Sequence, residues 1–138
     1  MKNKIAMKIF ISDDDTFSLN IYEQYLLMLG YTDITLFESK NECIDSLSRQ
    51  PYVILLDQGM DHRDGYEVLK KIKQFNPDIY VIFISDPGDR ETELLLLKSG
   101  AFDCIEKGPD ELKSISSLLE KISDIRQYLR THKSVHMK

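Results

Sequence analysis

The amino-acid sequence predicts an α/β fold, a doubly wound parallel sheet with helices on both faces, in a chain of 138 residues. Three observations predict it. Five short apolar runs alternate with five segments that carry apolar residues at helical spacing. Residues 53–56 and 81–84 are apolar without interruption, as strands buried on both faces should be. Parallel neighbours also need a connection long enough to hold a helix, and the helical segments supply it.

The first half of the chain begins with a strand and a helix that have clear boundaries. Residues 8–12 are mostly β-branched or aromatic and end at aspartates, which favour turns. Residues 16–29 then carry apolar side chains at helical spacing, and Gly30 marks the end of the helix. The same alternation next predicts a strand over 33–37, a helix over 39–49 and a strand over 53–56.

The second half of the chain repeats the alternation. It predicts a helix over 65–75, a strand over 80–84, a helix over 90–99, a short strand at 104–105 and a helix from 110 to about 130. Four consecutive leucines, residues 94–97, lie on the fourth of these helices, and a helix cannot turn all of them toward the core. We expect Leu95 to be exposed, either as an ordinary surface leucine or as a partner contact.

The last helix continues the apolar pattern with heptad spacing, at Ile115, Leu118, Ile122, Ile125 and Leu129. We therefore expect a domain over residues 1–121 and a helix extension with a tail over 122–138. The extension would project beyond the domain and either form a homodimer or lead into a further domain. Two heptads are too few to predict a coiled coil, so a frayed or back-folded tail is the alternative.

Composition bounds the kind of protein. The hydrophobic fraction is 42%, and 23 acidic against 18 basic side chains give a net charge of −5, which argues against non-specific binding to nucleic acid or anionic membrane. Cys43 and Cys104 lack the spacing of a metal knuckle or a disulfide framework. No signal peptide and no apolar window of about 20 residues is present. We expect a cytoplasmic protein.

Polar side chains follow four of the predicted strands where each strand ends. Asp13 and Asp14 follow the first strand, Asp57 the third, Ser85 the fourth and Lys107 the fifth. In an open parallel sheet the carboxyl ends of the strands share one edge, and ligands bind there. One polar residue at a strand end is ordinary, because strand ends are wet. Carboxylates, a hydroxyl and an amine at corresponding ends favour a site.

The chemistry that this set supports is phosphoryl transfer. Carboxylates in close company need a divalent cation, and Mg²⁺ prefers carboxylate oxygens and water. The cation would neutralise the phosphoryl group, while lysine and serine would bind its other oxygens. An aspartate can act as the nucleophile and form an aspartyl phosphate.

Taken together, these pieces resemble the receiver domains of two-component signalling over about residues 7–121. The matching stretches, in order, are Ile9-Phe-Ile-Ser-Asp-Asp14, Ile54-Leu-Leu-Asp57 continuing to Asp64-Gly65-Tyr-Glu-Val-Leu69, Val81-Ile-Phe-Ile-Ser85, and Gly100-Ala-Phe-Asp103 followed by Lys107. Each stretch alone is a weak signal. Their order and spacing together are specific for the family.

The resemblance implies a flavodoxin-like (βα)5 sheet with strand order 2-1-3-4-5. It implies that Asp57 accepts a phosphoryl group from a histidine kinase or phosphotransfer protein, and that Ser85 and Lys107 bind it. Mg²⁺ would be held by Asp14 and Asp57, by the Gly59 carbonyl, and by Asp13 through water.

The resemblance also implies how such a switch works. The serine would move toward the phosphate, and the face formed by the fourth helix, fifth strand and fifth helix would repack for a downstream protein. Such a protein is a switch more than an enzyme, because it catalyses only its own phosphorylation and dephosphorylation.

Four positions depart from the family pattern. Asp61 replaces a usual proline, and Asp86 replaces a small residue, so its carboxylate would repel a phosphoryl donor. Cys104 stands where an aromatic side chain often follows the serine inward. Gly108 follows Lys107, with Pro109 one place late, so the familiar lysine-proline bond and its constraint on the lysine are missing.

Other functions remain open from the sequence alone. A receiver that binds partners without phosphorylation is favoured by Asp61, Asp86 and Cys104. A phosphatase of the haloacid dehalogenase type needs an acidic residue two places after the nucleophile, where Gly59 stands. A dinucleotide-binding domain needs a glycine-rich turn after the first strand, and none follows it.

Overall fold

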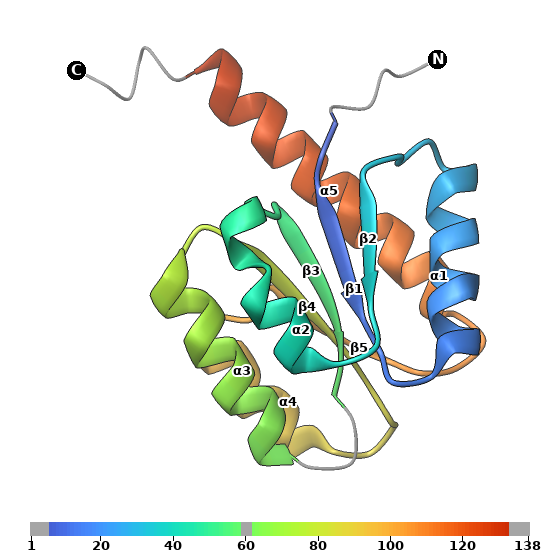
Figure 1. The fold of residues 1–138 in the computed structure, drawn as a ribbon, viewed down its shortest axis with the longest axis vertical. Helices are drawn as coiled ribbons and strands as arrows, with labels where there is room; N and C mark the ends of the chain where they lie inside the picture. The colour runs from blue at the N-terminus through green and yellow to red at the C-terminus, as the bar shows by residue number, and fades with distance from the viewer. Residues whose placement is uncertain (1–5, 59–61, 133–138) are drawn as a thin grey trace.

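A computed structural model describes residues 6–58 and 62–132, and it contains a five-stranded parallel sheet (Figure 1). The strands lie in the order β2-β1-β3-β4-β5, so the predicted fold class and strand order are confirmed. Their bounds are β1 Ile9–Ser12, β2 Ile34–Phe37, β3 Val53–Asp57, β4 Tyr80–Ser85 and β5 Asp103–Glu106.

Helices cover both faces of the sheet. Their bounds are α1 Thr16–Met28, α2 Lys40–Asp45, α3 His62–Phe75, α4 Arg90–Lys98 and α5 Glu111–Thr131, with a short 3₁₀ helix at Leu47–Arg49. Helices α1 and α5 pack on one face, and α2, α3 and α4 pack on the other (Figure 1). No helix in the described part of the chain is long and apolar enough to cross a membrane.

The sheet divides the core into two layers because successive side chains along a strand point to opposite faces. In β1, Ile9 and Ile11 pack in the layer of α1 and α5, whereas Phe10 packs in the layer of α2, α3 and α4. Residues 53–56 of β3 and 81–84 of β4 pack alternately into the two layers, which is why these runs are apolar without interruption, as the sequence predicts. The rule also decides the face to which the polar residues at the strand ends point.

The prediction of one continuous helix over residues 39–49 is wrong. Helix α2 is capped at its start by Ser39, whose hydroxyl accepts from the Glu42 amide at 3.1 Å. It ends at Asp45, where the Ser46 hydroxyl bonds back to the Glu42 carbonyl at 3.0 Å. Such a bond competes with the helical ladder and favours a break. Gln50 then takes a left-handed conformation with φ of 62°.

The end of α5 packs against the domain more than expected. Ile122 is fully buried in the core layer of α1 and α5, so its predicted place on an exposed seam is wrong. One turn later, Arg126 donates to the Ala6 carbonyl at 2.6 Å and lies over the Tyr52 ring. Leu129 is 47% exposed. The division of the chain after residue 121 stays a prediction.

Candidate functional site

The carboxyl ends of β1 and β3 bring three aspartates together. Ser12 pairs with Leu56 in the parallel register, so the next residues, Asp13 and Asp57, lie side by side. Asp14 completes the group, and carboxylate oxygens of the three residues all lie within 4.8 Å of one another. This is the cluster that the sequence predicts at the sheet edge.

The third consecutive aspartate has a different task. Asp15 caps α1, because its carboxylate accepts from the Phe17 amide at 3.0 Å and from the Ser18 hydroxyl at 3.0 Å. An aspartate at this position satisfies an otherwise unpaired amide at the helix start. Asp13 in turn accepts from the Asp15 amide at 2.9 Å through Oδ1. The run of aspartates therefore starts the helix and also holds Asp13 in place.

Asp13 is a buried carboxylate with a raised pKa. Burial raises its pKa to about 6, and the negative charges of Asp57 and Asp14 add to that rise. The Asp15 amide and Lys107 oppose the rise. Asp13 Oδ2 is buried without a hydrogen-bond partner among the described residues. A buried, unpartnered carboxylate oxygen beside two other carboxylates is a group whose charge a bound cation would balance.

Among the described residues, Lys107 supplies a positive charge directly beside Asp57. Its Nζ lies 2.9 Å from Asp57 Oδ1, and its backbone amide donates to the Ser85 carbonyl at 2.8 Å, which continues the ladder past β5. Burial lowers the lysine pKa, but the hydrogen bond and charge of Asp57 outweigh it and raise the pKa overall. The charge of Asp86 acts in the same direction. The ammonium therefore stays charged and directed at Asp57.

The other side of the same sheet edge holds a group of buried polar atoms. The Ser12 and Ser85 hydroxyls and both amide atoms of Gln58 are buried, with no hydrogen-bond partner in the part of the chain that is described. Gln58 N donates to the Ile84 carbonyl at 2.8 Å, so Gln58 and Ser85 are neighbours across β3 and β4. The alternation assigns these side chains to the face of α3 and α4.

Gln58 was not predicted from the sequence. Its side chain fills the space that a Cβ on Gly65 would need, because Gln58 Oε1 lies 2.8 Å from that position. The sequence signal that could have identified Gln58 is its place as a polar residue directly after the strand that ends in Asp57. Two further predicted residues, Gly59 and Asp61, lie outside the described residues.

Two other predicted features can be located. Leu95 is 46% exposed, which confirms that prediction. The Cys104 thiol lies 4.0 Å from the Glu93 carbonyl, and burial raises its pKa to about 12. Cys104 is therefore a neutral thiol on the side of β5 that faces α4.

The donor set fits Mg²⁺. Three carboxylates offer hard oxygen ligands within reach of one ion, and Asp14 is exposed, so the cluster opens to water. Mg²⁺ keeps several waters and takes only a few carboxylates from a protein. The Lys107 ammonium, 2.9 Å from Asp57 Oδ1, adds a second positive group that could bind an anion beside such a cation.

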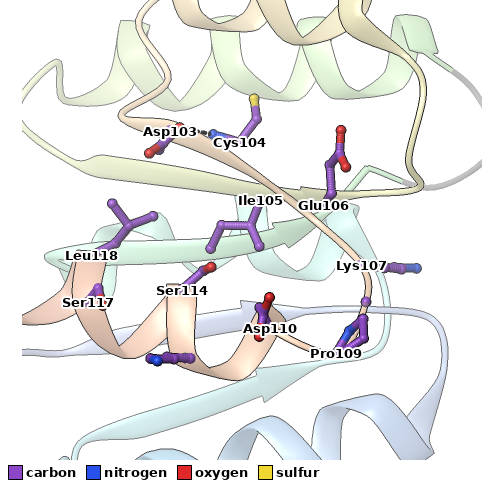
Figure 2. A pocket seen from close by; sticks show the side chains of 12 residues that line it. Asp103, Cys104, Ile105, Glu106, Lys107, Pro109, Asp110, Ser114, Ser117 and Leu118 are labelled. Carbon is purple, nitrogen blue, oxygen red and sulfur yellow. Dashed lines mark hydrogen bonds between the residues drawn. The ribbon is translucent and has the colours of Figure 1, made fainter.

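A groove of about 620 Å³ lies beside the site, between β5 and the first turns of α5. Figure 2 shows Ile105, Ser114 and Leu118 along it, with the Lys107 side chain directed away from them. The groove therefore does not contain the acidic cluster. It adjoins the same loop that carries Lys107.

Known proteins resemble this chain over most of its length. The response regulator receiver domain family matches residues 9–119. The DNA-binding transcriptional regulator NtrC of Salmonella typhimurium is 33% identical over 114 residues, which are 82% of this chain and 24% of that protein. The nitrogen assimilation regulatory protein NtrX of Azorhizobium caulinodans is 30% identical over 95% of this chain and 31% of its own length.

A solved structure gives the same result for the fold. The response regulator receiver domain protein from Clostridium thermocellum superposes with a TM-score of 0.80 at 24% identity, over 91% of this chain and 99% of that one. The chain thus spans about a quarter to a third of the two regulators described above, and nearly all of this receiver domain.

Proposed function

The chain belongs to the response regulator receiver domain family, and from this premise we propose that Asp57 accepts a phosphoryl group in an Mg²⁺-dependent reaction. Receiver domains of this family are signalling switches, and the relatives named above are regulators. The observation that carries the proposal is the arrangement around Asp57. Two further carboxylates have oxygens within 4.8 Å of one of its own, and the Lys107 ammonium lies 2.9 Å from its Oδ1.

The residues divide the work of the transfer between them. An Asp57 oxygen attacks the phosphorus, and the bond from phosphorus to the donor's leaving group breaks as the new P–O bond forms. Asp13, Asp14 and Asp57 would hold Mg²⁺, which supplies positive charge to the phosphoryl oxygens when bound. Lys107 binds another of these oxygens, and the Ser85 hydroxyl donates to a third after moving from its buried position.

The partners of this reaction follow from the same proposal. A histidine kinase or phosphotransfer protein would supply the group as a phosphohistidine, whose imidazole nitrogen is the leaving atom. The groove between β5 and α5 lies on the face where a downstream protein would read the change. Ser85 and Lys107 couple this face to Asp57, because Lys107 N is bonded to the Ser85 carbonyl.

Mass spectrometry of the protein with acetyl phosphate and Mg²⁺ tests the proposal. We expect wild type to gain one phosphoryl group and Asp57→Asn to gain none. Asp110→Asn is the matched control, because Asp110 is exposed at the start of α5 and outside the acidic cluster. Equal modification of wild type and Asp57→Asn, or an unmodified wild type, would refute the assignment of Asp57.

A further inference from the structure

Glu111 joins two parts of the site that are far apart in sequence. Its Oε2 accepts from the Tyr22 hydroxyl at 2.6 Å, and its Oε1 accepts from the Gly108 amide at 3.3 Å. The Glu111 amide also donates back to the Gly108 carbonyl at 3.2 Å. One carboxylate therefore connects α1, which begins directly after the acidic cluster, with the loop that carries Lys107.

The three bonds close a small, defined turn. Glu111 is the first residue of α5, and its carboxylate reaches back three residues to the amide of Gly108, which lies two residues before the N-cap Asp110. Here the amide belongs to Gly108, the residue that follows Lys107, and no hydrogen bond from the Asp110 side chain caps the helix. The turn between β5 and α5 is therefore held by Glu111.

Tyr22 makes the other end of this contact rigid. Its ring is 4% exposed in the core layer between α1 and α5. A bond of 2.6 Å from a hydroxyl to a carboxylate is in the range of charge-assisted hydrogen bonds, which are stronger than neutral ones. A packed ring cannot follow a moving loop, so Glu111 and Gly108 are held relative to α1.

The position of Lys107 depends on this turn. The Lys107 amide donates to the Ser85 carbonyl at 2.8 Å. On its other side Lys107 is followed directly by Gly108, whose position the turn fixes, and Pro109 comes one place later. Glycine allows the loop backbone many conformations, and the hydrogen bond from the Gly108 amide to the Glu111 carboxylate restricts them.

We propose that Tyr22 and Glu111 are positioning residues that set the place of the Lys107 ammonium through the Gly108 turn. The proposal deepens the proposed function and rests on it, since the ammonium matters because of the phosphoryl group at Asp57. A misplacement of about 1 Å in such a group slows a reaction by up to about a hundredfold. We name the three-residue contact Tyr22–Glu111–Gly108 the loop clamp.

The test compares phosphorylation rates with acetyl phosphate and Mg²⁺ in loop-clamp variants and matched controls. Glu111→Gln keeps the shape but offers one acceptor oxygen to two donors, and Tyr22→Phe removes one donor. We expect each to slow phosphorylation about tenfold. Tyr25→Phe removes a hydroxyl from the same helix, and Glu91→Gln removes a charge from the first turn of α4. Both controls should react at the wild-type rate.

A double-mutant cycle separates a positioning role from general destabilisation. In a Lys107→Ala background, Glu111→Gln should have no further effect, because the group that the loop clamp positions is gone. An equal slowing in both backgrounds, or slowing no greater than in Tyr25→Phe and Glu91→Gln, would overturn the proposal. Thermal unfolding of each variant ensures that the rates refer to folded protein.

Amide hydrogen exchange supplies a measurement that needs no phosphorylation. The Gly108 amide should exchange faster in Glu111→Gln and Tyr22→Phe than in wild type, and unchanged exchange in both would overturn the loop clamp itself. An unmodified wild type would instead refute the proposed function of Asp57. The two failures are therefore distinguishable.

Discussion

The two ends of the same five strands are built from opposite kinds of residue. At the amino edge, the rings of Tyr52, Tyr80 and Phe102 lie in a row, with centroids 5.4 and 5.1 Å apart. Polar groups there are paired: Lys73 Nζ donates to the carbonyls of Pro77 and Ile79. At the carboxyl edge, carboxylates crowd together and several buried polar atoms lack partners among the described residues.

This difference indicates that the amino edge stabilises the fold and that the carboxyl edge destabilises it. Aromatic pairs and satisfied hydrogen bonds stabilise a fold, whereas buried polar groups without partners cost free energy. Unsatisfied groups collect at functional sites, where a ligand supplies what the protein lacks. The amino edge is therefore a structural end of the sheet, and the carboxyl edge is its chemical end. The following predictions test this contrast, beginning with the largest effect.

Truncation at the amino edge should cost the most stability. Tyr80 contacts both Tyr52 and Phe102, so Tyr80→Ala removes two ring contacts and the packing of a partly buried ring against the core. We expect the free energy of unfolding to fall by about 3 kcal/mol in urea titrations. Tyr128→Ala is the control, because Tyr128 is 54% exposed and should change stability by less than about 0.5 kcal/mol. Similar losses in the two variants would contradict a structural role for the aromatic row.

Addition of Mg²⁺ should stabilise the carboxyl edge. A ligand that binds only the folded state raises stability by about 2.7 kcal/mol at a hundredfold excess over its Kd. We expect this rise in thermal or urea unfolding of wild type, and a much smaller one in Asp57→Asn, which removes a charge from the cluster. Ca²⁺ and Na⁺ at equal ionic strength separate specific binding from screening. An equal Mg²⁺-dependent rise in the stability of Asp57→Asn would show that the ion binds outside the acidic cluster.

Removal of the buried charge of Asp13 should stabilise the metal-free protein. Its pKa is raised to about 6 in the folded protein, so the folded state disfavours the ionised form. The penalty is absent below about pH 4, grows as the pH rises through the interval between the two pKa values, and is complete above about pH 6. In EDTA at pH 7, Asp13→Asn should raise the free energy of unfolding by about 2 kcal/mol.

The pH series gives this prediction its control. The gain from Asp13→Asn should shrink as the pH falls from 7 toward 4, and the variant should also bind Mg²⁺ more weakly than wild type. Asp45→Asn, at the end of α2 and away from the cluster, should show neither change. A gain that is constant with pH would mean that burial of an ionised Asp13 is not its cause.

Replacement of the buried Gln58 amide should give the smallest gain. Gln58 is 3% exposed, and neither amide atom has a hydrogen-bond partner among the described residues. Gln58→Met keeps the shape beside Gly65 and removes the unsatisfied amide, so stability should rise by about 1 kcal/mol. Urea titration measures it, with the exposed Gln24→Met as control. A loss of stability would show that the amide has a partner that matters.

Much of the fold could be predicted because its signals are local. The continuous apolar runs at β3 and β4 and the helical spacing between them predict a parallel sheet, and its topology follows from the family resemblance. The grouping of polar side chains at the candidate site could also be predicted, because the carboxyl ends of parallel strands meet at one edge of a sheet. The break after Asp45 was missed because the hydrogen bond from Ser46 competes with helix propensity.

The order of the elements and the polar residues that follow the strands could be predicted from the chain alone, because short-range periodicity and turn chemistry depend on neighbouring residues. Tertiary structure alone decided contacts between distant residues. It placed Tyr22 against Glu111, 89 positions away, buried Ile122 in the core, and left the side-chain amide of Gln58 without a hydrogen-bond partner among the described residues. These outcomes depend on which faces meet after packing, and no local pattern specifies that.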